Sequence, residues 1–244
     1  TSIGYQFGEM GNSRLDYAGG GNPSPAYYQD LPSYFLADTN GPDYEGAYIA
    51  QENFVNDGQI NWNRIYDANI TNNLSNLNAA YVLYEDRVDD TQLTINSAYN
   101  REINENIKIT SSVNYRNLVS DNFAEISDML GGYSYSNIDS FDNLDYNLLS
   151  PNSIVSDGDK FKYHYKMNAE EISLFSMINF SYNKLEFYLA GDLTNTTYQR
   201  DGVFENEANA GNSSGKGEEI KFDGYGVKAG ITYKFSGKHI LDFN

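Results

Sequence analysis

A long alternation of apolar and polar side chains runs from Asn168 to Arg200 and constrains the fold more than any other feature. A short break at residues 182–184 divides it into two runs. Apolar residues share one parity in each run: Ile172, Leu174, Ile178, Phe180 and Tyr182 in the first, and Leu185, Phe187, Leu189 and Leu193 in the second. Successive side chains of a strand point to opposite faces. The pattern therefore predicts a hairpin of two long strands with one apolar face.

The opposite face of this hairpin is polar. In the second run it carries Glu186, Tyr188, Asp192 and Thr194. A sheet with one apolar and one polar face can be a soluble sheet backed by solvent, or a barrel wall with lipid outside and water inside. The rest of the chain must decide between these two interpretations.

The composition excludes several classes of function. The 244 residues carry 34 Asp and Glu against 16 Lys and Arg, a net charge of -18, so a nucleic-acid backbone would be repelled. There are no cysteines, which excludes disulfide scaffolds, thiolate zinc sites and cysteine nucleophiles. The two histidines, His164 and His239, are too far apart in sequence to indicate a histidine-rich metal site. We expect no nucleic-acid partner.

The hydrophobic segments are too short for a membrane-spanning helix. The longest apolar run, residues 79–84, has six residues, whereas a helical span needs about 18 or more. Barrel strands are shorter and alternate, so this result does not exclude them. The 22 tyrosines suit amphipathic surfaces such as membrane interfaces or sugar-binding faces, because each has an apolar ring and a polar tip.

Similar alternation recurs along the chain and predicts seven strands. They lie near residues 1–16, 79–103, 107–119, 160–182, 185–200, 220–235 and 239–244. Long polar segments at 18–78, 121–159 and 201–219 alternate with tight turns at 104–106, 183–184 and 236–238. This order places every long loop at one end of the sheet and every tight turn at the other.

The first long loop is rich in aromatic residues, which argues against disorder. It also contains Gly and Pro breakers, such as residues 19–21 and 23–25, and a segment at 61–69 that could form a short helix. Short turns at one end and long loops at the other are typical of outer-membrane barrels. We therefore predict an all-β chain that forms a segment of an antiparallel transmembrane β-barrel with long extracellular loops.

Four segments carry a resemblance to a known family. They are Gly4–Arg14 (GYQFGEMGNSR), Pro25–Tyr34 (PAYYQDLPSY), Trp62–Asn69 (WNRIYDAN) and Ile126–Gly132 (ISDMLGG). As an ordered set they resemble the barrel of TonB-dependent outer-membrane receptors of the kind abundant in Bacteroidetes, which are Gram-negative. The resemblance covers nearly all of this chain, but only a quarter to a third of a whole receptor.

The resemblance implies a fold and a function. In that family a plug domain fills a barrel of 22 strands, and the inner-membrane TonB complex acts through a short box ahead of the plug. The substrates are scarce nutrients such as metal chelates, cobalamin or glycans. Residues 1–244 contain no plug, no TonB box and no terminal aromatic strand, so we expect them to be an interior slice of one barrel domain.

The implied location is the cell outer membrane, where the chain would act in transport as a receptor. The implied partners are outer-membrane lipid and lipopolysaccharide, the TonB complex through the plug, a nutrient ligand, and a surface lipoprotein or other envelope protein. Two other classes stay open. One is a soluble or surface-attached carbohydrate-binding or adhesion module, and the other is a barrel that serves as a scaffold in an envelope complex.

Aromatic residues are the candidates for functional positions. Six lie in the predicted long loops, where they could cap a ligand or pack the loops on one another: Tyr27, Tyr28, Trp62, Tyr66, Tyr133 and Tyr135. Three others lie beside the tight turns and fit an aromatic girdle at the membrane interface: Tyr182, Tyr233 and Phe235.

Charged residues give weaker signals. The acidic run of Asp139, Asp142 and Asp145 could bind Ca²⁺ through its oxygens, but it lacks the ligand order of an EF-hand. Carboxylate pairs such as Glu170-Glu171 show no spacing typical of a glycosidase, so we expect no enzyme and no cofactor. Basic residues at the start of one strand could meet anionic phosphates or pair with nearby acidic loops: Lys160, Lys162, His164 and Lys166.

Overall fold

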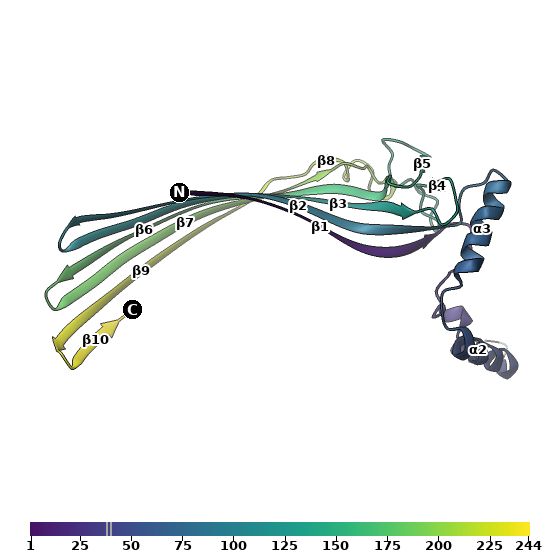
Figure 1. Ribbon diagram of the computed structural model, residues 1–244, viewed down its shortest axis with the longest axis horizontal. Helices are drawn as coiled ribbons and strands as arrows, with labels where there is room; N and C mark the ends of the chain where they lie inside the picture. The colour runs from purple at the N-terminus through teal and green to yellow at the C-terminus, as the bar shows by residue number, and fades with distance from the viewer. Residues whose placement is uncertain (38, 40) are drawn as a thin grey trace.

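The computed structural model describes residues 1–37, 39 and 41–244 and shows one long, twisted antiparallel sheet (Figure 1). The sheet has the order β1-β2-β3-β6-β7-β9-β10. Its strands are β1 Ser2–Tyr17, β2 Tyr81–Asn104, β3 Ile107–Asp128, β6 Lys160–Tyr182, β7 Leu185–Gly202, β9 Ile220–Ser236 and β10 His239–Phe243. A short strand, β8 Gly215–Lys216, pairs with the end of β7, and β4 Tyr135–Ser136 pairs with β5 Ile154–Val155 in a separate small sheet.

A strand forms at each of the seven predicted positions, and each pairs with its neighbour in the predicted antiparallel order. The sheet is open: β1 and β10 are its two edges, and they do not pair with each other. The main error in strand length concerns β3, which continues to Asp128 instead of ending at 119. Its last residues alternate as a strand does, but their charged side chains resemble a loop in the sequence.

Tight turns join the strands at one end of the sheet, as predicted. Asn183 stands at the start of the two-residue turn between β6 and β7 with a φ of 49°. Asparagine tolerates this left-handed conformation better than most residues, and such turns match the twist of the paired strands. In the turn between β2 and β3, the backbone N–H of Asn106 donates to Oδ1 of Asn104 at 2.9 Å.

The prediction of an all-β chain is wrong for the first long loop. Between β1 and β2 the structure has α1 Pro32–Leu36, α2 Tyr44–Asp57 and α3 Trp62–Leu74, together with the 3-10 turn η1 Tyr28–Asp30. A second 3-10 turn, η2 Glu207–Asn209, lies between β7 and β8. The predicted short helix at 61–69 is confirmed as the first part of α3.

Side chains cap the two longer helices at their N-termini. Oδ1 of Asp43 accepts from the backbone N–H of Gly46 at 2.9 Å, and Oδ1 of Asn61 accepts from that of Arg64 at 3.0 Å. Such caps satisfy amide groups that have no partner within the helix. The helical periodicity of α2 is weak, since only Ala47 and Ala50 are buried along it. The cap at Asp43 is therefore the clearer sequence signal for this helix.

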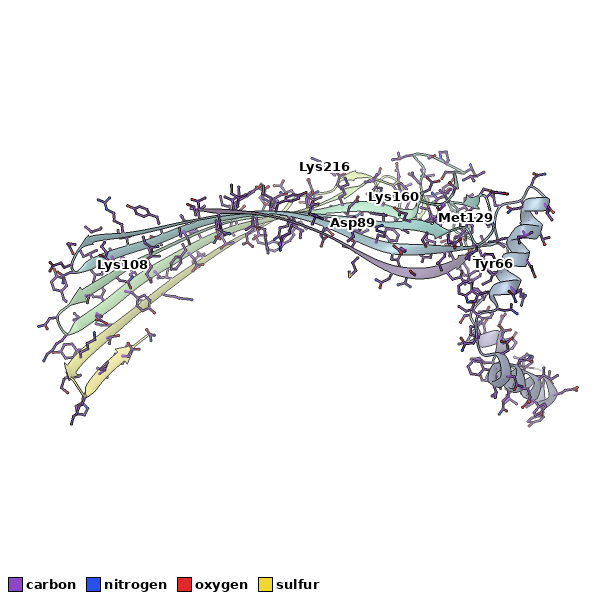
Figure 2. All side chains as sticks on the ribbon, in the orientation of Figure 1. Tyr66, Asp89, Lys108, Met129, Lys160 and Lys216 are labelled. Atoms are coloured by element: carbon purple, nitrogen blue, oxygen red, sulfur yellow. The ribbon has the colours of Figure 1, made fainter. Side chains whose placement is uncertain are left out.

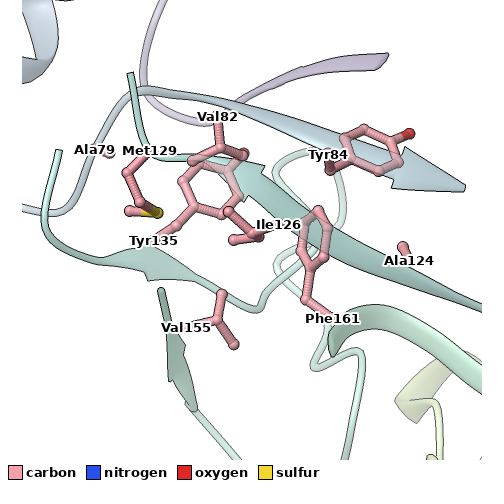
Figure 3. Close-up of a cluster of buried hydrophobic side chains, with 9 residues drawn as sticks. All are labelled: Ala79, Val82, Tyr84, Ala124, Ile126, Met129, Tyr135, Val155 and Phe161. Carbon is pink, nitrogen blue, oxygen red and sulfur yellow. The ribbon is translucent and has the colours of Figure 1, made fainter. Parts of the chain in front are cut away.

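Two small hydrophobic clusters anchor the loops and helices to the loop end of the sheet. On β2, Val82 and Tyr84 of the first cluster share the parity of the polar side chains, so we call it the polar-face cluster. Its members, drawn in Figure 3, are Ala79, Val82, Tyr84, Ala124, Ile126, Met129, Tyr135, Val155 and Phe161. The apolar-face cluster joins α3 to the other side, with Ile65, Ala80, Tyr81 and Leu130 at its centre and Leu15, Tyr17 and Leu83 packed against it. Loops thus cover one face and α3 the other.

One buried amide connects α3 to the sheet. Asn69 is fully buried, and its Nδ2 donates to the carbonyl oxygens of Tyr81, Met129 and Leu130 at 2.8, 3.0 and 3.1 Å. Its Oδ1 accepts from the backbone N–H groups of Ala80 and Tyr81 at 2.8 and 3.1 Å. The side chain therefore joins the helix, the start of β2 and the loop after β3.

Replacing Asn69 by Ala should loosen α3 from the sheet, because it leaves two N–H groups and three carbonyl oxygens without this partner. We expect a cost of about 3 kcal/mol, which corresponds to about hundredfold faster amide exchange across residues 62–74. Hydrogen exchange followed by mass spectrometry measures it. Asn63→Ala is the control, because Asn63 is exposed on the same helix. Equal exchange in both variants would contradict the assigned role of Asn69.

Candidate functional site

The half of the sheet near the tight turns carries an apolar surface on one face. The strand registers place side chains of one parity in common rows across neighbouring strands. We call this surface the apolar belt, and its residues are Ile3, Tyr5, Phe7, Leu93, Ile95, Tyr99, Ile107, Ile109, Val113, Tyr115, Ile172, Leu174, Ile178, Phe180, Tyr182, Leu185, Phe187, Leu189, Leu193, Tyr225, Val227, Ala229, Ile231, Tyr233, Leu241 and Phe243. The belt crosses all seven long-sheet strands.

Neither a helix nor a second sheet covers the belt within the part of the chain that the structure describes (Figure 1). Phe187, Leu189 and Leu193 are 38%, 51% and 59% exposed. Water is a poor environment for an apolar surface of this extent, and such surfaces mark contacts with membrane or protein. In the described residues, no helix is long and apolar enough to cross a membrane.

The belt runs obliquely across the strands. The position of its loop-side margin can be compared between strands by following each row to β6. On β9 the margin is Tyr225, which lies in the row of Leu174, and on β1 it is Phe7, which lies in the row of Asn168. Between β9 and β1 the margin thus moves by six residues over five strand-to-strand steps. With about 3.4 Å per residue and about 4.8 Å between strands, a belt of constant height requires strands tilted by about 40°.

The opposite face is polar and contains small side chains. In β9 it carries Gly224, Gly226 and Gly230. Side chains from β7 lie over two of them: a Cβ on Gly226 would be 2.4 Å from Oδ1 of Asp192, and one on Gly230 would be 2.3 Å from Cε1 of Tyr188. The glycines therefore leave room for the polar side chains of the neighbouring strand.

Charged residues follow the belt toward the loops (Figure 2). Asp121 accepts from Nζ of Lys160 at 3.3 Å and lies 2.8 Å from Nε2 of His164, and Lys162 pairs with Asp16 at 2.8 Å. Of the two interpretations of the basic residues at the start of β6, pairing with nearby acids is the one that these contacts support. Lys166 stands opposite Asp121 in the strand register.

The three predicted interface aromatics lie together at the turn end. Leu185 pairs with both Tyr182 and Tyr233, which places these three side chains in one row. The rings of Tyr233 and Phe235 meet edge to face at 4.7 Å. Tyr182 and Phe235 are exposed at 60% and 57%. The three rings therefore lie on the belt face beside the tight turns, and their role as a membrane-interface girdle stays a prediction.

The aromatic residues of the first loop form separate groups. The rings of Tyr27 and Tyr28 meet edge to face at 4.9 Å, and Tyr28 meets Tyr34 at 5.7 Å. Trp62 and Tyr66 lie on α3, are 44% and 40% exposed, and lie outside this group of three tyrosines. The structure thus does not bring these four predicted residues into one ligand-binding surface.

Tyr133 and Tyr135 differ sharply in their surroundings. Tyr133 is 82% exposed, whereas Tyr135 is 2% exposed within the polar-face cluster. The hydroxyl of Tyr135 donates to Oδ2 of Asp16 at 3.0 Å. Burial, and then the charge and hydrogen bond of Asp16, raise the pKa of Tyr135 well above its usual range. Tyr135 therefore packs the loop onto the sheet, in line with the packing interpretation of the loop aromatics.

Carboxylates of the acidic run accept hydrogen bonds from backbone N–H groups of their own loop. Oδ1 of Asp139 accepts from the backbone N–H of Phe141 at 2.8 Å, which is the main reason that its pKa is lowered. Oδ1 of Asp145 accepts from the backbone N–H of Asn152 at 2.8 Å. No group of three or more His, Cys, Asp or Glu residues suited to hold a metal occurs in residues 1–37, 39 and 41–244. The geometry gives the calcium interpretation no support.

Sequence reasoning missed a cavity of about 510 Å³ between the helices and the start of β2. Its lining includes Asp30, Phe35, Phe54, Asp57 and Arg64, and none of the six predicted loop aromatics. The cavity was hard to anticipate, because these residues come from η1, α1, α2 and α3, and only α3 was predicted.

Comparison with protein families, curated proteins and solved structures finds no match to this chain.

The raised pKa of Tyr135 predicts a loss of stability at alkaline pH. The stabilisation that depends on the protonated phenol is complete below the unfolded pKa of about 10 and is lost as pH rises above it. Tyr135→Phe, which cannot ionise, should lose less of its loop protection between about pH 9 and 11.5 than the unsubstituted protein. It should also start about 1 kcal/mol lower at neutral pH, because one hydrogen bond is missing.

Hydrogen exchange of residues 129–159 across this pH range measures the effect. Tyr133→Phe is the matched control, since Tyr133 is exposed and should leave the pH profile unchanged. The assignment fails if Tyr135→Phe follows the same pH profile as Tyr133→Phe.

Proposed function

We propose that this chain forms an arc of the wall of a transmembrane β-barrel in a bacterial outer membrane, with the belt facing lipid. The observation that carries the proposal is the oblique course of the belt. A belt of constant height on a barrel wall must cross the strands at their tilt angle, which is 35–45° in such barrels. The tilt of about 40° obtained from the strand registers agrees with this range.

The two faces and the two ends fit the same proposal. The turn-end half is apolar outside and polar inside, with an aromatic row at its margin, as in outer-membrane barrels. The strands continue beyond the belt into a charged zone, and loops and helices gather there. In this assignment the turns face the periplasm, the loop end lies outside the cell, and the polar face lines the lumen.

We further propose that the barrel belongs to a TonB-dependent receptor that takes up a scarce nutrient. The support is the set of four resembling segments together with the large external structure above the belt. No bond is made or broken in such a mechanism. The wall holds the ligand-binding loops in place, while force from the TonB complex on the plug opens a path through the lumen.

Arginine substitutions at two depths test the lipid-facing belt. Leu189 lies midway along the belt on β7 and Leu193 lies at its margin. Leu189→Arg should destabilise the protein in lipid bilayers by about 2–4 kcal/mol, and Leu193→Arg by less than about 1 kcal/mol. Reversible denaturant unfolding in liposomes measures both values.

The two leucines are similarly exposed, at 51% and 59%, so each serves as a control for the other. In a soluble module both substitutions would lie on a solvated surface and change stability by only about 0.5 kcal/mol. Equal, small effects, together with a protein that stays monodisperse without detergent, would refute the barrel.

The receptor function predicts a growth phenotype. A strain without this protein should grow poorly when one nutrient class, supplied as ferric chelates, cobalamin or defined glycans, is limiting. Loss of TonB should reproduce the defect for the same class, because the import needs energy from that complex. A strain that grows equally well on all of them would favour a structural scaffold, provided that the Leu189→Arg result supports the barrel.

A further inference from the structure

The cavity among the helices lies apart from the polar face of the sheet. It extends from the segment after β1, past α1 and α2, to the first turn of α3 and Tyr81. Tyr81 belongs to the apolar-face cluster, so the cavity is on the belt side of the wall, at the loop end. A molecule bound here would not occupy the lumen of the proposed barrel.

The cavity lining contains both charged and apolar side chains. Asp30, Asp57 and Arg64 contribute their charges, whereas Phe35, Ile49 and Phe54 contribute apolar surface. None of the three charged side chains takes part in an ion pair within the described part of the chain. Opposite charges thus stand around one hollow without neutralising each other, which leaves both available to a ligand.

The local backbone positions Arg64 on this cavity. The cap from Asn61 fixes the first turn of α3 on which Arg64 lies. Gly21 runs close by, since a Cβ at that position would be 3.9 Å from Nη2 of Arg64. The side chain of Arg64 is exposed, and its guanidinium group offers a planar set of donors that suits a carboxylate.

The volume and lining restrict the ligand. A cavity of about 510 Å³ lies within the range for small-molecule sites. The two carboxylates favour a cationic group on the ligand, and the guanidinium favours a carboxylate. The two phenylalanine rings favour apolar side chains on the same ligand. A short peptide with free amino and carboxyl termini combines all three features, whereas a neutral sugar offers neither charge.

We propose that this cavity is a binding site for short apolar peptides, with the peptide ammonium at Asp30 and Asp57 and its carboxylate at Arg64. The site is distinct from the lumen, and its occupancy does not depend on the barrel assignment. Because the cavity lies among the helices at the loop end, a molecule can reach it without first passing along the polar face of the sheet.

Trileucine binding to the detergent-solubilised protein, measured by isothermal titration calorimetry, tests the proposal. We expect saturable binding of one peptide per chain. N-acetylated trileucine and trileucine amide each lack one terminal charge, so each should bind about tenfold more weakly. These ligand changes leave the protein unaltered, and a loss of affinity therefore cannot result from misfolding.

Protein variants assign the two ends. Asp57→Asn should weaken the binding of trileucine about tenfold and that of N-acetylated trileucine little, because the acetylated peptide has no ammonium group. Arg64→Met should weaken the binding of trileucine about tenfold and that of trileucine amide little, because the amide has no carboxylate. Glu52→Gln is the matched control, because it removes the same charge from α2 outside the cavity lining and should leave affinity within about twofold.

Two results would overturn the proposal. One is the absence of saturable trileucine binding, and the other is an affinity that neither the blocked termini nor the Asp57 and Arg64 variants change. Saturable binding of maltotriose in place of trileucine would likewise overturn it, since it would identify a neutral glycan site. Failure of the barrel experiments would leave these outcomes unaffected, so the two proposals are tested separately.

Discussion

The hydrogen-bonded pairing of long strands in a single layer is the constraint on which the rest of this structure depends. Within the sheet each inner strand satisfies its backbone on both sides, so the ladder can extend over more than 20 residues in β2, β3 and β6. One layer cannot bury an apolar face by itself. The belt therefore needs an apolar environment from outside the sheet, and in the proposed barrel the bilayer would supply it without any further element of the chain.

At the loop end, the apolar side chains of the sheet are covered by other parts of the same chain. There the sheet carries hydrophobic side chains on both faces, and the chain supplies its own cover: loops with β4 and β5 on one side and α3 on the other. Burial in this region is complete for residues such as Val82 and Phe161. Among the described residues, both hydrophobic clusters thus lie beyond the belt, so the half of the sheet with the belt has one uncovered face and the loop end is covered on both faces.

Most of the sheet could be predicted from the sequence, because period-two alternation is a local signal. Leu185, Phe187 and Leu189 share a parity that can be read directly, and the Asn183 turn that aligns them with β6 has its own residue preference. The end of β3 was missed because its charged side chains replace the apolar ones beyond the belt. In that zone successive side chains still point to opposite faces, but they no longer alternate between apolar and polar, so the strand cannot be recognised from the sequence.

The candidate site was far less predictable. The burial of Tyr135 depends on residues that are distant in sequence, including Asp16, and Tyr133 two positions away has almost the opposite exposure. The cavity is assembled from four short helical elements whose relative placement no local pattern encodes. Aromatic content identified the loops as structured, but it could not separate rings that pack from rings that remain accessible.

The attachment of α3 through Asn69 has an evolutionary consequence. The amide recognises three backbone carbonyl oxygens and two backbone N–H groups, and none of these contacts requires a particular side chain at Tyr81, Met129 or Leu130. Exposed side chains near this junction can therefore change without removing the hydrogen bonds by which Asn69 attaches α3 to the sheet. In the proposed barrel, the exposed surface of the loop end could thus vary while its attachment to the strands beneath stays the same.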